Sequence, residues 1–193
     1  LVARSLGEGK KERARRLFSL FVYATAISGT VIAIIIFIFL RPILQLMGAE
    51  GELLENSLLY GRVLLPFLPL FMLQFEFASS FITAEKPRLG LIVTLLAGCT
   101  NMFFDALFMG VFKWNLAGAA IATGLGILVG AIIPLIYFSR PNSSLLRLGR
   151  TKINDVALLR ACTNGSSELM SNIALSLVSM LYNLQLLKYV GEN

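Results

Sequence analysis

The sequence predicts an all-α protein, a polytopic bundle of transmembrane helices with five spans. Three observations favour this fold. Hydrophobic residues make up 56% of the 193 residues, only 15% are charged, and long apolar runs recur along the chain. Soluble domains carry about a quarter charged residues. Residues 32–40 are apolar on every face, which excludes the alternation of a transmembrane β-strand and favours helices that satisfy their own backbone groups.

Each of five segments contains the roughly 20 mostly apolar residues that a membrane-spanning helix needs. The first and the fourth contain no charged residue, whereas the fifth is long and more polar at its start. In the second, Pro66 and Pro69 remove backbone hydrogen bonds and should kink or loosen the helix. The predicted spans are residues 18–40, 58–82, 89–109, 116–138 and 156–187.

Basic residues are concentrated in alternate loops, as five alternating spans require. Thirteen of the 17 Lys and Arg residues lie in segments 1–16, 83–88 and 139–160. The positive-inside rule places these segments in the cytoplasm, and we expect a multi-pass protein of the bacterial cytoplasmic (inner) membrane with the lipid bilayer as a partner. The cluster in 1–16 could also be a nucleic-acid patch, but its alternation with the spans favours topology, so no nucleic-acid partner is expected.

The predicted organisation has four parts. Residues 1–16 form a cytoplasmic basic loop after the end of a preceding helix, and 17–138 hold four transmembrane helices of one lobe. Residues 139–157 are the longest loop, which we interpret as a cytoplasmic linker between lobes. Residues 158–193 hold the first helix of a second lobe and a turn. The composition at both ends is typical of elements cut short, so we expect further helices of the same full-length chain as partners.

Several function classes are disfavoured by what the sequence contains. It has no histidine, and Cys99 and Cys162 lie in or beside apolar runs without the spacing of a disulfide framework or metal motif. No Gly-x4-Gly-Lys-Ser/Thr motif is present, which argues against ATP hydrolysis within this chain. We therefore expect that the protein is not an enzyme and that it binds no cofactor.

Three acidic residues fall inside predicted spans: Glu76, Asp105 and Glu168. A charge at mid-bilayer costs at least a few kcal/mol, so such a residue must be paired, protonated or facing water. Asn101 precedes Asp105 by four residues and shares its helix face. A carboxylate and an amide oxygen one turn apart could bind Na⁺ or hold a proton. An Asp at the membrane interface, near the outer helix end, fits the pattern equally well.

Small residues form a ridge on the fourth span, with Ala122, Gly126 and Gly130 spaced four apart. Such ridges let helices approach closely in lipid. Thr123 lies beside the ridge, about two turns below the outer surface, and could meet Asp105 on the preceding antiparallel helix. Its hydroxyl could instead bond to a carbonyl of its own helix.

Other residues are candidates for a substrate cleft. Phe71 belongs to a stripe with Phe67 and Phe75 that could line a cavity for flat aromatic cations, although lipid-facing packing is the favoured interpretation. Glu76 lies near the cytoplasmic helix end. Glu168 and Asn172, one turn apart on the fifth span, form either a second polar site or a structural hydrogen bond between helices.

Four motifs resemble those of the multidrug and toxic compound extrusion (MATE) transporters, in order and spacing, over essentially the whole chain. They are Val2-Ala3-Arg4-Ser5-Leu6-Gly7-Glu8-Gly9 with its basic tail, Ala84-Glu85-Lys86-Pro87, Asn101-x3-Asp105 and Gly118-Ala119-Ala120-Ile121-Ala122-Thr123. The segment Asn164-Gly165-Ser166-Ser167-Glu168 is similar to the DinF-like bacterial branch.

This resemblance implies two six-helix lobes, with the present chain running from the end of helix two through helix seven. It also implies that Asn101, Asp105 and Thr123 belong to a coupling-cation site, completed by an Asp on helix one. Other branches use a Glu on helix seven, where Glu168 and Asn172 lie.

The implied activity is antiport by alternating access, in which amphipathic organic cations or other small molecules leave the cell in exchange for H⁺ or Na⁺. The coupling ion would bind at Asp105 and Asn101. Two alternatives stay open: a flippase for lipid-linked oligosaccharides of the same superfamily, and a non-transporting membrane scaffold or intramembrane enzyme. A flippase should carry a strongly basic cavity, and the first four predicted spans contain a single basic residue, Arg62.

Overall fold

The structure is a computed structural model that describes residues 1–141 and 144–190, with the backbone alone at 183, 184 and 186–190. Every regular element in the described residues is helical, which confirms the all-α prediction. The chain divides into two compact units, Val2–Lys152 and Ile153–Asn193 with Leu1. Residues 142–143 of the predicted linker and the predicted turn at 191–193 lie outside the described residues.

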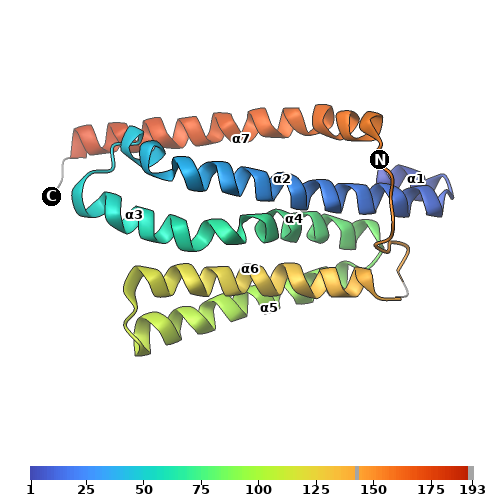
Figure 1. Ribbon diagram of the computed structural model, residues 1–193, viewed down its shortest axis with the longest axis horizontal. Helices are drawn as coiled ribbons and strands as arrows, with labels where there is room; N and C mark the ends of the chain where they lie inside the picture. The colour runs from blue at the N-terminus through green and yellow to red at the C-terminus, as the bar shows by residue number, and fades with distance from the viewer. Residues whose placement is uncertain (142–143, 191–193) are drawn as a thin grey trace. The chain divides into compact units, whose positions relative to one another are not determined.

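The first unit contains all elements but one, and Figure 1 shows its long helices running side by side. The second unit holds the single helix α7 (Asp155–Val190). The elements of the first unit are α1 (Val2–Gly7), α2 (Lys11–Leu46), α3 (Gly51–Leu64), a 3₁₀ turn η1 (Leu65–Phe67), α4 (Leu68–Thr83), α5 (Pro87–Asp105), a π-helical turn η2 (Ala106–Val111) and α6 (Asn115–Ser139).

Four helical segments are long and apolar enough to cross a membrane: Lys11–Leu46, Gly51–Thr83, Pro87–Val111 and Asn115–Ser139. The predicted number of five is therefore wrong by one, counted over the described residues. The segment predicted as the fifth span does form the continuous helix α7, but Arg160, Asn164 and Glu168 in its first half lower its hydropathy. The chain is a multi-pass membrane helix bundle.

Two antiparallel hairpins build the first unit. One pairs α2 with the α3–α4 segment, the other pairs α5 with α6, and α6 packs against α3 and α4 to join them (Figure 1). Glycines make these approaches close: a Cβ added at Gly29 of α2 would lie 3.0 Å from the Cα of Pro69, and one at Gly126 of α6 would lie 3.0 Å from the carbonyl oxygen of Ala97. Small residues permit such backbone contact in lipid.

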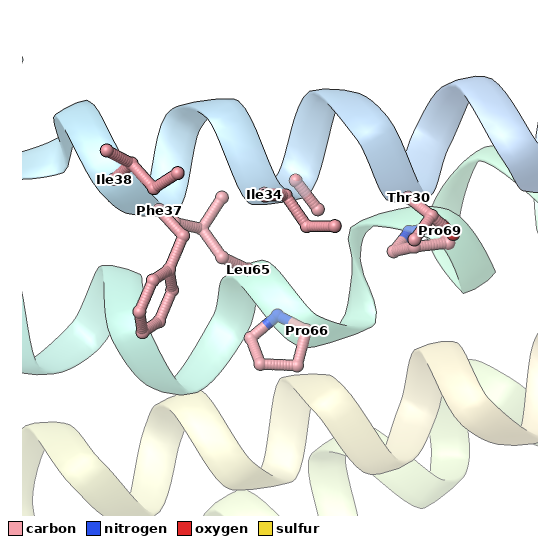
Figure 2. A pocket seen from close by; sticks show the side chains of 8 residues that line it. Thr30, Ile34, Phe37, Ile38, Leu65, Pro66 and Pro69 are labelled. Carbon is pink, nitrogen blue, oxygen red and sulfur yellow. The ribbon is translucent and has the colours of Figure 1, made fainter.

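The second span is broken where the prolines predicted a kink. Residues Leu65–Phe67 form the 3₁₀ turn that separates α3 from α4. Pro66 lies at the start of this turn and Pro69 at the start of α4, positions where a missing N–H costs no helical bond. The break leaves an apolar groove of about 250 Å³ against α2 (Figure 2). Its lining residues are Thr30, Ala33, Ile34, Phe37, Ile38, Leu65, Pro66 and Pro69.

An aromatic cluster forms the core at the end of the unit that carries the basic loops. The ring of Phe138, at the end of α6, lies 5.0 Å from the rings of Phe18 and Phe81 and 5.8 Å from that of Phe77. All four side chains are almost fully buried. Three helices, α2, α4 and α6, are therefore fixed to one another at this end, and aromatic pairs at such distances add about 0.5–1.5 kcal/mol each beyond burial.

The segment after α6 is tied to the start of α2. The hydroxyl of Thr151 donates to the carbonyl of Arg16 (3.0 Å), and the N–H of Gly149 donates to the hydroxyl of Ser19 (3.0 Å). The side chain of Leu146 is fully buried in the aromatic cluster. The first part of the predicted linker is thus packed into the first unit.

The junction of α1 and α2 is held by ion pairs on one carboxylate. Glu8 accepts hydrogen bonds from Lys10 Nζ (2.8 Å) and Arg4 Nε (2.9 Å). These bonds, with that of Lys10 the stronger cause, lower the pKa of Glu8 to about 2. The stabilisation of the folded protein by these two bonds is therefore fully present above the ordinary carboxyl pKa. It is lost only as the pH falls toward 2.

We predict that Leu146→Ala destabilises the first unit by about 2–5 kcal/mol, the usual cost of truncating a buried leucine, because the cavity would open inside the aromatic cluster. Thermal unfolding of the purified protein in detergent measures this loss. Arg147→Ala is the matched control, since its exposed side chain should contribute less than about 0.5 kcal/mol. Equal unfolding temperatures for the two variants would contradict the packing of the linker described above.

Candidate cation site

Two of the predicted site residues meet between α5 and α6. The amide Nδ2 of Asn101 on α5 donates a hydrogen bond to Oγ1 of Thr123 on α6, at 3.4 Å. This is a long bond, and both side chains are half-buried. Thr123 therefore contacts the neighbouring helix through Asn101 and not through Asp105. Because the amide nitrogen of Asn101 is used here, its oxygen is left for another partner.

The contact depends on a glycine one turn further along α6. A Cβ at Gly126 would lie 2.9 Å from the Cβ of Asn101 and 3.0 Å from the carbonyl oxygen of Ala97. Real Cβ atoms do not come that close to a backbone oxygen and a neighbouring side chain without movement of the helices. The absence of a side chain at 126 is therefore what lets Asn101 reach Thr123.

Asp105 is the last residue of α5 and is half-buried. Its Oδ1 is buried and has no hydrogen-bond partner within the described part of the chain. One oxygen of this carboxylate is therefore shielded from solvent inside the first unit. The side chain lies one helical turn from Asn101, although no bond joins it to Asn101 or Thr123 in the described residues.

The helix changes its winding immediately after Asp105. Residues Ala106–Val111 form a π-helical turn, and the N–H of Phe112 bonds to the carbonyl of Leu107, five residues earlier. Single π turns inside α-helices occur frequently at functional sites. The turn leads into a tight connection in which Lys113 and Asn115 adopt positive φ angles of 55° and 47°.

Stacked aromatic rings cover this end of the hairpin. The ring of Phe108 lies 5.3 Å from that of Phe104 and 5.1 Å from that of Trp114. Trp114 and Phe112 are about half exposed, which is typical of aromatic residues at a membrane–water interface. Along the chain, Asp105 lies between Phe104 and Phe108 of this aromatic group.

These groups supply the oxygen ligands that a small hard cation prefers. The carboxylate oxygen of Asp105 lacks a donor, the amide oxygen of Asn101 is not used by Thr123, and the Thr123 hydroxyl oxygen can accept a further bond. These are the oxygen types that a proton or a Na⁺ ion binds, and a coupling-ion site at these residues stays a prediction. Over residues 1–141 and 144–190 no group of three or more His, Cys, Asp or Glu side chains has the arrangement of a transition-metal site.

Glu76 lies on α4 and is half-buried. Its backbone carbonyl accepts a hydrogen bond from the hydroxyl of Ser80 (2.8 Å), a bond within the same helix. No hydrogen bond or ion pair to its carboxylate occurs among the described residues. Its place in a substrate cleft stays a prediction.

The predicted phenylalanine stripe is divided between two environments. The ring of Phe67 lies over Gly124 of α6, where an added Cβ would come within 2.6 Å of it. Phe71 and Phe75 contact each other edge to face at 4.9 Å and are 41% and 64% exposed. The outward position of these two rings agrees with the lipid-facing interpretation, and the place of Phe71 in a substrate cleft stays a prediction.

Glu168 and Asn172 lie on α7, in the second unit, and both are exposed there. The amide of Asn172 donates to the backbone carbonyl of Glu168 at 3.0 Å. This bond is internal to α7, so the two side chains do not form a polar site by themselves. Their assignment to a second polar site stays a prediction.

One buried polar residue was not predicted. The side-chain oxygen of Gln74 on α4 is buried and lacks a hydrogen-bond partner in the described chain. Its signal in the sequence was weak: a single amide within the apolar run 68–82, with no second polar residue at a helical spacing. Gln74 packs against Gly130, a contact between distant parts of the sequence.

Curated relatives include multidrug export proteins from staphylococci. The chain is 24% identical over 192 residues to "Multidrug export protein MepA" of Staphylococcus saprophyticus, covering 97% of this chain and 42% of that protein. It is 26% identical over 147 residues to the protein of the same name from Staphylococcus haemolyticus, covering 75% of this chain and 32% of that one. The chain thus spans about two fifths of the length of the first of these relatives.

Two solved structures share the fold. A MOP-superfamily transporter from Pyrococcus furiosus, whose title reports a binding pocket of reverse polarity that suggests a different function, superposes with a TM-score of 0.89 over 99% of this chain and 43% of that one, at 20% identity. An inward-facing multidrug resistance MATE family transporter superposes with a TM-score of 0.76 over 81% of this chain and 36% of that one, at 21% identity.

The family assignment comes from the sequence of the first unit. The MatE family model matches residues 1–107, which is more than half of the chain, and includes Asn101 and Asp105. The chain belongs to the MatE family, as its motifs predicted.

Proposed function

We propose that this chain is part of a secondary active antiporter, in which Asp105 binds the coupling ion, H⁺ or Na⁺, and amphipathic organic cations or other small molecules are exported. The observation that carries this proposal is the buried Oδ1 of Asp105, which lacks a partner one turn from the Asn101–Thr123 pair. Membership of the MatE family and the export proteins among its relatives support the cargo class.

The physical reason for ion binding is the cost of an isolated carboxylate. A buried charge without a partner is strongly unfavourable, and within a membrane the cost is at least a few kcal/mol. A proton removes that charge, and a Na⁺ ion compensates it with help from the oxygens of Asn101 and Thr123. Either ion therefore stabilises this arrangement of α5 and α6.

Coupling to export needs a second arrangement in which the ion binds less well, because a ligand shifts an equilibrium only by its differential affinity. The Asn101–Thr123 bond is long and the turn after Asp105 is π-helical, so a small movement of α5 along α6 would change the oxygens around Asp105. Ion binding would then favour one packing of the lobe, and release would favour the other.

The proposed orientation places the basic loops in the cytoplasm of a bacterial cell. Segments 1–16, 83–88, 139–141 and 144–152 lie at the same end of the first unit as the aromatic cluster around Phe138. Asp105 lies at the opposite end, which would face the outside of the cytoplasmic membrane. The coupling ion would accordingly enter the site from outside, down its gradient.

We predict that Asp105→Asn reduces drug resistance of cells expressing the full-length protein to the level of cells without it, because the amide can neither take up a proton nor compensate a cation. Growth against a panel of cationic drugs measures the loss, with membrane insertion verified by immunoblot. Glu52→Gln, at an exposed acid outside the site, is the control. Resistance that Asp105→Asn leaves intact would refute the assignment.

A second prediction concerns the packing beneath the site. Gly126→Ala should push α5 away from α6 and separate Asn101 from Thr123. We expect ion-coupled transport to fall at least tenfold. The folded protein should also lose about 1–3 kcal/mol of stability, as is typical of overpacking. Drug-driven proton or Na⁺ flux in vesicles measures it. Gly98→Ala, where an added Cβ meets nothing within 4 Å, should transport normally. Equal flux in both variants would show that the close approach is not needed.

A further inference from the structure

A second buried oxygen without a donor lies deeper in the first unit, apart from the Asp105 site. It is Oε1 of Gln74, on α4, and no donor reaches it within the described residues. A buried amide oxygen without a hydrogen bond destabilises the fold, because its lost contact with water is not replaced. The side-chain oxygen of Gln74 therefore needs a hydrogen-bond donor at this position.

An acceptor on the neighbouring helix lacks its donor for a separate reason. Pro134 lies inside α6 and has no N–H, so the carbonyl of Gly130, four residues earlier, loses its helical hydrogen bond. Pro134 is also almost fully buried, and membrane interior offers no bulk water to such a carbonyl.

Gln74 and Gly130 are in direct contact. A Cβ added at Gly130 would be 2.7 Å from Cδ of Gln74 and 2.9 Å from its Oε1 and Nε2, so the amide rests directly on the Gly130 backbone. A small hollow adjoins them, with a volume of about 10 Å³. Its lining residues are Gln74, Ala78, Phe81, Gly90, Val93, Thr94, Gly130 and Pro134.

We propose that this hollow is a binding site for one water molecule, which donates its two hydrogens to Oε1 of Gln74 and to the carbonyl oxygen of Gly130. Its volume is at the lower limit for one water, and such a water needs at least two polar partners. A larger ligand does not fit. Two neutral acceptors match the two donors of water, whereas a metal cation would need more oxygen ligands than these residues provide.

The proposed water has a mechanical consequence for α6. Helices bend most readily where a proline interrupts the backbone bonds and another group completes them. A water-mediated bond is nearly as favourable as a direct one and can be exchanged. The water therefore makes the segment around Pro134 a joint at which α6 can change its bend without leaving Gln74 and Gly130 unpaired.

The direct test is a density map of the full-length protein at a resolution that reveals ordered waters. The expected result is a density peak within hydrogen-bond distance of both the Gln74 side-chain oxygen and the Gly130 carbonyl. An empty hollow would overturn the proposal. A Gln74 amide turned over, with its nitrogen donating directly to the Gly130 carbonyl and no water between them, would overturn it equally.

A double-mutant cycle tests the pairing in solution. Gln74→Met removes the polar partner at similar volume, and Pro134→Ala returns a backbone N–H to the Gly130 carbonyl. Gln74→Met should lower the unfolding temperature clearly when Pro134 is present and much less in the Pro134→Ala background. Ser80→Ala, a buried hydroxyl on α4 that bonds within its own helix, should show no such dependence on Pro134. Additive effects of Gln74→Met and Pro134→Ala would overturn the assignment of Gly130 as the shared partner.

Discussion

Helix α6 contacts its neighbours through positions that carry no side chain. The ring of Phe67 covers Gly124, Asn101 covers Gly126, and the amide of Gln74 covers Gly130, each closer than an added Cβ would allow. Between helices in lipid no hydrophobic force acts, and association relies on close packing and hydrogen bonds. The glycines of α6 therefore determine how near α4 and α5 can approach. That distance in turn sets the contacts of Asn101 and Gln74 with α6.

The same contacts explain where the polar groups of the first unit lie. Asn101 and Gln74 come from different helices, yet each is seated on a glycine of α6, one turn apart along it. A polar side chain on the lipid side would be costly, whereas on a glycine it is covered by the neighbouring helix, where Asn101 bonds to Thr123. The strip of α6 from Thr123 to Pro134 thus combines close helix contact with polar neighbours from α4 and α5.

The sequence was sufficient for the fold class and for most of the helices, because apolar runs of membrane length and the alternation of basic loops are local signals. Helix ends were predicted less well than helix centres. The spans predicted from residues 18 and 58 start at Lys11 and Gly51 in the structure, because helices continue past the apolar region through residues whose charge can reach water. The polar residues in the first half of α7 are visible in the sequence and explain why the predicted number of spans is too high by one. The π turn after Asp105 and the seat of Gln74 on Gly130 could not be predicted, because both depend on how distant segments pack.

The connection between the two units is short, because hydrogen bonds hold the residues on both sides of it. Thr151 is the last described residue that bonds to α2, through the carbonyl of Arg16. Asn154 already belongs to the next helix, since its Oδ1 accepts the N–H of Ala157 and caps α7. Only Lys152 and Ile153 lie between these anchors. These two residues separate the hydrogen bond that fixes the end of the first unit to α2 from the hydrogen bond that caps α7.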